Sequence, residues 1–166
     1  MADKPIVEKT FNEDLDVEEK IREGGILSHL YLEVQGNSLD AAKKALENTV
    51  FDRMVYEPNL YVLEAKMYQF VKEEGQEYYS GVIDVKSVAR DLRTFINVVM
   101  RYGPSAIEIL SPEEVTLKSE EMHAMVADIS DFVQHYFTNL FSMLKDEERV
   151  ALYNKMLNVP KREDKK

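Results

Sequence analysis

Residues 63–85 read LEAKMYQFVKEEGQEYYSGVIDV, and this stretch decides the fold. Apolar residues recur at every second position from Leu63 to Met67, and a similar alternation resumes from Tyr78 to Val85. A period of two is typical of strands that bury one face. The polar segment from Lys72 to Gly75 separates the two strands. The stretch therefore predicts a β-hairpin.

A strand and a helix are predicted before the hairpin. From Ile26 to Val34 the chain again alternates, with Leu30, Leu32 and Val34 on one face. Ser38 is a good N-cap for a helix that runs to about Phe51, because its hydroxyl can accept a hydrogen bond from an amide of the first turn. These segments predict a β-α unit that leads into the hairpin.

A second helix and a last strand are predicted after the hairpin. Ser87 is the expected cap of a helix that ends at Gly103, where glycine tolerates a left-handed backbone. Ala106 to Leu110 then forms a strand. The resulting order, β-α-β-β-α-β, predicts an α+β protein with a ferredoxin-like core over residues 25–118. In this arrangement two helices cover one sheet face and leave the other open.

The two ends of the chain are expected to differ from this core. Residues 1–24 are rich in acidic side chains and show no sustained period, which indicates a flexible acidic arm with one helical turn from Asp16 to Ile21. Residues 119–158 predict C-terminal helices that form a long arm, and residues 159–166 a disordered tail. One wide apolar stripe runs along the first of these helices. It consists of Met122, Met125, Val126, Ile129, Phe132, Val133, Tyr136, Phe137, Leu140 and Leu144.

The composition narrows the possible functions. The chain of 166 residues has no cysteine, which excludes disulfides, thiolate metal sites and thiol catalysis. Its formal net charge of −10 makes nucleic acid an unlikely partner, because affinity for phosphates rests largely on Lys and Arg. The first residues lack a secretory pattern, and no apolar run is long enough to cross a membrane. We therefore expect a cytoplasmic protein with no membrane contact.

Catalytic and metal-binding signals are weak. Glu120-x-x-His123 has a spacing used in di-iron bundles, but those sites need two copies of the motif and this chain has one. His29 could serve as a general base, although no partner lies near it in the sequence. We therefore expect no catalytic residue, no cofactor and no metal site.

Two candidate interfaces remain. Aromatic side chains are expected on the open sheet face at Tyr31, Tyr68 and Tyr78. Because most of their charged neighbours are acidic, we expect these tyrosines to be covered by protein and not to stack on RNA bases. The apolar stripe of the long helix adds Phe132, Phe137 and Phe141. Because exposed apolar patches of this size are rare on monomers, we expect a homodimer, with any other protein partner unidentified.

One part of the chain resembles a known family. The segments GVIDV at residues 81–85 and RYGPSAIEILSPE at residues 101–113 lie within residues 78–114. This region is similar to the C-terminal extension of WYL-domain transcriptional regulators. The resemblance implies a ferredoxin-like module and a role in ligand-responsive regulation.

These observations favour a non-enzymatic regulatory or scaffold protein that acts through protein–protein contacts and self-association. An alternative is a domain that binds a small molecule, or an enzyme that uses carboxylates, in a cleft between the sheet and the helical arm. A third possibility is a regulator that binds nucleic acid.

Overall fold

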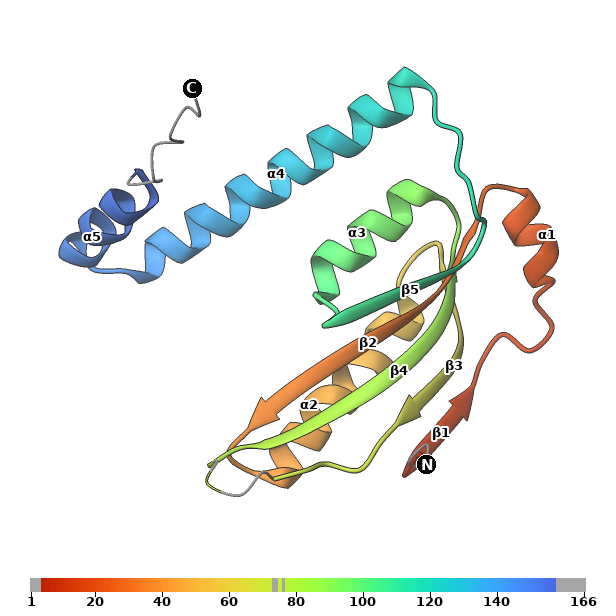
Figure 1. Ribbon diagram of the computed structural model, residues 1–166, viewed down its shortest axis with the longest axis horizontal. Helices are drawn as coiled ribbons and strands as arrows, with labels where there is room; N and C mark the ends of the chain where they lie inside the picture. Colours follow the sequence, from red (N-terminus) through yellow and green to blue (C-terminus); the bar gives the residue numbers. More distant parts are fainter. Residues whose placement is uncertain (1–3, 73–74, 76, 158–166) are drawn as a thin grey trace, which may run out of the picture. The chain divides into compact units, whose positions relative to one another are not determined.

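The computed structural model describes residues 4–72, 75 and 77–157, and it has an α+β architecture (Figure 1). The chain forms two compact units, Met1–Met125 and Val126–Lys166. The secondary structure elements, in chain order, are β1 (Val7–Thr10), α1 (Val17–Arg22), β2 (Ile26–Gly36), α2 (Leu39–Phe51), the 3-10 helix η1 (Met54–Tyr56), β3 (Leu60–Met67), β4 (Tyr79–Ala89), α3 (Leu92–Tyr102), β5 (Ala106–Ser111), α4 (Ser119–Met143) and α5 (Asp146–Leu157).

The first unit is built on a five-stranded sheet in the order β1-β3-β4-β2-β5, and every neighbouring pair is antiparallel. The predicted hairpin is confirmed, since β3 and β4 are adjacent and antiparallel. In the centre of the sheet Leu30 of β2 lies opposite Val85 of β4. The predicted α+β class and the long C-terminal helix are also confirmed.

Helices α2 and α3 pack on one face of the sheet, where both contact β2 and β4. A single buried cluster joins Leu46 and Val50 of α2 to Phe95 of α3 and to the inward side chains of the strands. Each helix has a side-chain cap at its start. Ser38 Oγ accepts a hydrogen bond from the Ala41 amide at 3.4 Å, and Asp91 Oδ1 accepts one from the Thr94 amide at 2.7 Å.

The end of α3 agrees with the sequence prediction, but its start does not. Gly103 has φ 55, and its amide donates to the Val99 carbonyl, as a left-handed C-cap does. The predicted cap Ser87, however, lies within β4, and Asp91 takes its place. At the end of β4 the consecutive residues Val88 and Ala89 are both fully buried. The alternation of apolar and polar residues is therefore lost there, although the strand continues.

The N-terminal segment also differs from its prediction. Sequence reasoning assigns residues 1–24 to a flexible arm with one helical turn over residues 16–21. The structure has a helix there, α1 (Val17–Arg22), but it places Val7–Thr10 in strand β1, paired with β3. Helix α1 contacts β4. The predicted tail over residues 159–166 lies outside the described residues.

The second unit begins within α4, whose 25 residues continue from the first unit without a break, and it ends with α5. Arg149 of α5 donates from Nε to the Phe141 carbonyl of α4 at 2.7 Å. In the described part of the chain no helix is both long and apolar enough to cross a membrane.

Candidate interaction surfaces

The outer face of the sheet is the face that α2 and α3 leave uncovered. Because side chains alternate along a strand, the residues on this face follow from the sheet register. On the three inner strands they are Leu27, His29, Tyr31, Glu33, Gln35, Tyr61, Glu64, Lys66, Ser80, Val82, Asp84, Lys86 and Val88. Most of them are charged or polar, so this face is not a simple apolar interface.

A histidine–aspartate pair lies at the centre of this face. His29 Nδ1 of β2 is 2.6 Å from Asp84 Oδ1 of β4, and both side chains are largely covered. The His29 ring stacks on Tyr31, with ring centroids 6.2 Å apart. Burial, followed by the negative charges of Asp84 and Glu108, raises the pKa of Tyr31. The pair therefore holds an aromatic side chain in a fixed position on the sheet.

A second polar network lies on the β1 side of the same face. Lys66 Nζ is 2.7 Å from Glu64 Oε2 and 3.5 Å from Glu8 Oε1. The hydrogen bond from Lys66 lowers the pKa of Glu64, and burial opposes this shift. Glu64 also lies opposite Lys86 in the register, so unlike charges face each other across the strands. The charges on this face therefore largely compensate one another.

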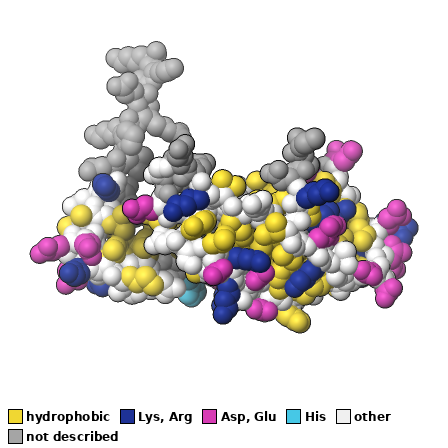
Figure 2. Space-filling view, turned by 90° about the horizontal axis from the view of Figure 1, so that it is seen from below, with side chains coloured by type: hydrophobic (Ala, Val, Ile, Leu, Met, Phe, Trp, Pro, Cys, Tyr) yellow, Lys and Arg dark blue, Asp and Glu magenta, His cyan; other side chains and the backbone are white. Residues whose placement is uncertain are grey.

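A space-filling view shows one face of the molecule, seen from below the view of Figure 1. Over the face that it presents, Lys and Arg side chains are interleaved with Asp and Glu and with hydrophobic side chains (Figure 2). No single sign of charge dominates that view. A mixed surface of this kind provides neither a strong electrostatic field nor a large apolar area for a partner.

The three predicted tyrosines do not form one cluster. Tyr31 and Tyr68 are both half-buried and close enough to interact electrostatically. Tyr78 is 49% exposed and precedes β4, six residues before the Asp84 that lies opposite Tyr31. Six residues of strand span about 20 Å. The structure therefore brings two of the predicted residues together and separates the third.

Helix α4 provides a different kind of surface. In the second unit its apolar residues are largely exposed, with Val126 at 66%, Tyr136 at 60% and Met143 at 82%. Phe132 is also exposed, whereas Phe137 and Phe141 are half-buried. Phe132 stacks on Tyr136 at 6.3 Å, and Phe137 lies 6.3 Å from Phe141. The three predicted phenylalanines thus belong to one aromatic row along the helix.

Apolar residues of α4, five of them exposed and Leu140 half-buried, follow a heptad pattern. They are spaced alternately by three and four residues, at Val126, Ile129, Val133, Tyr136, Leu140 and Met143. This spacing keeps them on one seam and is the pattern by which helices pair in coiled coils. We call these six residues the α4 seam. The positions that flank it carry no charge and are Met125, Ser130, Phe132, Phe137, Asn139 and Leu144.

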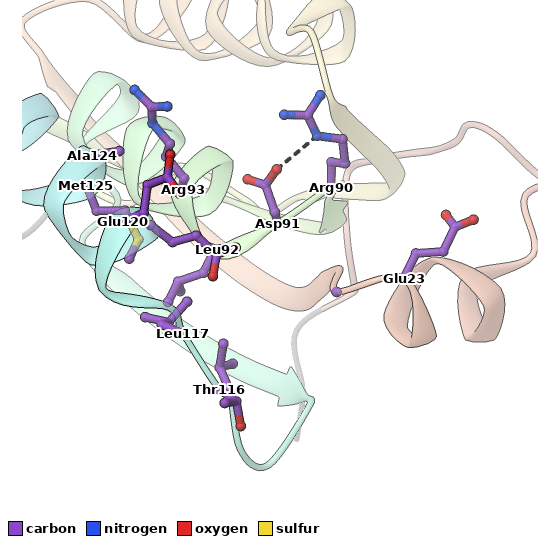
Figure 3. Close-up of a pocket in the computed structure, with 13 residues that line it drawn as sticks. Glu23, Arg90, Asp91, Leu92, Arg93, Thr116, Leu117, Glu120, Ala124 and Met125 are labelled. Carbon is purple, nitrogen blue, oxygen red and sulfur yellow. Dashed lines mark hydrogen bonds and ion pairs between the residues drawn. The ribbon is translucent and has the colours of Figure 1, made fainter.

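A pocket of about 440 Å³ lies in the first unit, where the start of α3 meets the segment before α4 and the first turns of α4 (Figure 3). Its lining has both signs of charge. Arg90 and Arg93 come from the β4–α3 region, and Glu120 comes from α4. Leu92 and Leu117 supply apolar walls. A pocket of this size can hold a small molecule.

The pairing of Asp84 with His29 is the main polar contact that sequence reasoning misses. It is 55 positions from His29, and only the pairing of β2 with β4 brings the two side chains together. The sequence contains one indication of this pairing, because His29 and Asp84 both occupy outward-facing positions in strands whose residues alternate between the two faces. Among the described residues, no three His, Cys, Asp or Glu side chains converge on a possible metal position.

Comparison with known proteins gives one match. A family model described as the MJ0538 family matches residues 28–164, which include most of both units, and the chain therefore belongs to this family. The comparisons with curated proteins and with solved structures give no match.

Proposed function

We propose that this member of the MJ0538 family is a non-enzymatic regulatory or scaffold protein that acts through protein–protein contacts, first of all with a second copy of itself. The observation that carries the proposal is the exposed α4 seam. Among the described residues of the second unit, α5 and the rest of α4 leave most of the seam exposed. An apolar surface of this kind on a soluble chain indicates an interaction site.

A second copy is the occupant that the seam fits best. A heptad seam is complementary to itself, because the side chains of one helix insert between those of an identical helix. The uncharged flanking positions avoid repulsion between two acidic chains at the contact. Asp128 and Asp131 lie away from the seam on the polar face, where they stay hydrated.

The expected energy is sufficient for a dimer. Each Val, Ile, Leu, Met or Phe side chain that becomes fully buried contributes about 1.5–3 kcal/mol. Six seam residues from each copy could therefore offset the cost of association, which is roughly 4–15 kcal/mol. Twofold dimers are also the commonest soluble oligomers.

The strand order of the first unit supports a finer assignment of the fold. The strands β3-β4-β2-β5, with α2 after β2 and α3 after β4, follow the arrangement of a ferredoxin-like core, with β1 added at one edge. We propose this relationship for the core. The similarity of residues 78–114 to the extension of WYL-domain regulators stays a prediction.

Sedimentation of the full chain over a wide concentration range tests the proposed dimer. The wild-type chain should sediment at twice the chain mass, and the combined Phe132→Ser and Phe137→Ser substitutions should give a monomer. Thr138→Ser on the polar face of the same helix is the matched control and should leave the dimer intact. A wild-type monomer at every concentration would contradict the proposal. Dissociation by Tyr31→Glu alone would move the contact to the sheet.

A second candidate function is small-molecule binding, favoured by the pocket between α3 and the start of α4 (Figure 3). Its carboxylates, among them Glu120 and Glu121, are those on which a carboxylate-based enzyme would depend. A thermal-shift screen of metabolites separates this function from scaffolding, because a ligand held well above its dissociation constant raises the free energy of unfolding by several kcal/mol. Complexes that weaken steeply with salt would instead indicate a nucleic-acid partner.

A further inference from the structure

Strand β5 forms one edge of the sheet, and β1 forms the other (Figure 1). The outward amide and carbonyl groups of an edge strand have no partner in the sheet and can pair with a further strand. The two edges differ in composition, because β1 has four residues that include Glu8 and Lys9, whereas Glu108 is the only charged residue of β5. Short, charged edges discourage pairing, so β5 is the edge that is open to a further strand.

The inner face of β5 carries two isoleucines that the helices leave uncovered. Ile107 lies opposite Leu30 of β2, and Ile109 lies opposite Ser28. Leu30 and Ser28 are fully buried, yet Ile107 is 45% exposed and Ile109 is 52% exposed. Helices α2 and α3 contact β2 and β4, so their coverage weakens at the edge. A strand added beside β5 would place its own side chains against these isoleucines.

The regular part of this edge is short. The register between β2 and β5 pairs Ser28 with Ile109 but Leu27 with Ser111, which leaves Leu110 as an extra residue. A bulge of this kind bends its strand and interrupts the ladder. A further strand can therefore pair with residues 106–109, where two isoleucines face inward and one glutamate faces outward.

Glu108 supplies the charge of this site. It is exposed and lies on the outer face, with His29 opposite it on β2 and Lys86 opposite His29 on β4. Neighbouring strands lie about 4.8 Å apart, so Lys86 is roughly 10 Å from Glu108 along the register. Among the described residues none makes a hydrogen bond or an ion pair with the Glu108 carboxylate. A basic side chain on an added strand would lie directly opposite Glu108 and pair with it.

We propose that the β5 edge binds an extended peptide segment of another protein as an additional antiparallel strand. The segment has lysine or arginine opposite Glu108 and β-branched apolar residues opposite Ile107 and Ile109. In strand addition of this kind main-chain hydrogen bonds supply the affinity, and alternate side chains supply the specificity. The edge lies in the first unit, so this contact does not depend on self-association through the α4 seam.

A second copy of β5 fits the edge less well. Ala106–Ser111 contains no lysine or arginine, so two paired β5 strands would leave both Glu108 side chains without a counterion. Each chain also has a formal net charge of −10, and this charge repels a second copy but attracts a basic segment. Charge complementarity therefore favours a different protein as the partner.

NMR of the full chain tests the site, with the capped peptide Ser-Thr-Val-Lys-Val-Thr as the probe. In antiparallel pairing its lysine can lie opposite Glu108 while its two valines lie opposite Ile107 and Ile109. The backbone amide signals of residues 106–109 should shift saturably as this peptide is added. A peptide with glutamate in place of lysine should bind about fivefold more weakly, because an attractive cross-strand pair becomes repulsive.

Two variants and one modified peptide serve as controls. Glu108→Lys should reverse the preference, so that the glutamate peptide binds more tightly than the lysine peptide. Glu18→Lys, at an exposed position of α1, should keep the preference of the wild-type chain. The lysine peptide with its three central amides N-methylated cannot donate the main-chain hydrogen bonds of a ladder and should not bind.

The peptide comparisons use the wild-type chain, and circular dichroism establishes that each variant is folded. The proposal is overturned if the lysine peptide does not bind saturably, or if the N-methylated peptide binds equally well. It is also overturned if Glu108→Lys keeps the wild-type preference. Signals of residues 106–109 that shift with protein concentration in the absence of peptide would assign the edge to a second copy instead, which contradicts the proposal.

Discussion

The outer sheet face and the α4 seam are two surfaces that the core leaves uncovered. They differ in whether their side chains find interaction partners within the chain. On the sheet, His29 pairs with Asp84, and Lys66 pairs with Glu64. On α4, apolar side chains such as Val126 and Tyr136 remain exposed. A surface with compensated charges is stable in water without a partner, whereas an exposed apolar seam gains free energy when a partner covers it.

An uncovered sheet face is therefore not by itself evidence of an interface. The tyrosines of the open sheet suggest a docking surface in the sequence, but around Tyr31 the structure supplies His29 as a stacking neighbour and Asp84 as a nearby charge. On the seam Tyr136 stacks on Phe132, but the flanking positions carry no charge. The next four predictions run from the largest expected effect to the smallest.

The sheet unit should be far more sensitive to truncation than the seam in an isolated chain. Leu30 is fully buried in the core, and Leu30→Ala should lower the free energy of unfolding by about 2–5 kcal/mol. Ile129→Ala on the seam should change it by no more than about 0.5 kcal/mol at concentrations where the chain is monomeric. Urea unfolding of both variants checks the difference. Equal losses would mean that the seam is packed within the monomer.

The seam should be more sensitive than the sheet when association is measured. Val133→Asp places a charge at the contact and removes about 1.5–3 kcal/mol of apolar burial from each copy. It should therefore give a monomer in light scattering. Thr138→Asp adds the same charge on the polar face of α4 and should leave the dimer unchanged. Two dimeric variants would exclude the seam as the contact.

A smaller effect is expected at the start of α3. Asp91→Ala removes the helix cap and should cost about 1 kcal/mol of stability. Burial would raise the pKa of Asp91, but the backbone amide and side chain of Thr94, together with Arg90, lower it. Because the pKa of Asp91 is lower in the folded chain than its ordinary value of 3.8, the carboxylate stabilises the fold at pH values above 3.8. This stabilisation is lost as the pH falls through the pKa of Asp91 in the folded chain.

Thermal unfolding of wild type and Asp91→Ala as a function of pH checks this prediction. The difference in melting temperature should be constant near neutral pH and should shrink in acid. Dimerisation through the seam should be unaffected, because α3 lies in the other unit. A difference that grows as the pH falls would contradict the proposed role of the carboxylate.

The smallest effect is expected for the charge network on the outer sheet face. Lys66→Met should cost no more than about 1 kcal/mol, since the ion pairs of Lys66 are partly exposed to solvent. The hydrogen bond from Lys66 lowers the pKa of Glu64, so this stabilisation should disappear as the pH falls below the ordinary value of 4.5. Urea unfolding at neutral and acidic pH measures it. A loss comparable to that of Leu30→Ala would show that the network supports the fold.

The central hairpin could be predicted from the sequence because its strands alternate between one buried and one exposed face. The edge strand β1 could not, since its four residues include a single large apolar side chain, Val7. The start of α3 was misplaced because Val88 is buried on the outer face, so that both faces are covered at the end of β4. Local alternation therefore fails at the edge of the sheet and where a second element covers its open face.

The candidate surfaces were only partly predictable. The stripe of α4 was visible in the sequence, but Phe132, Phe137 and other apolar residues beside the seam widen it and conceal the heptad spacing. The His29–Asp84 pair depends on a strand register that no local pattern fixes.

Strand β1 has a consequence for the solubility of the chain. An uncovered sheet edge offers a row of free amide and carbonyl groups on which further chains can add as strands, and this leads to fibrils. By pairing with β3, β1 moves the edge from a strand with the buried residues Leu60, Val62 and Met67 to a short one with Glu8 and Lys9. Short, charged edges resist such growth. These few N-terminal residues thus act as a guard against aggregation.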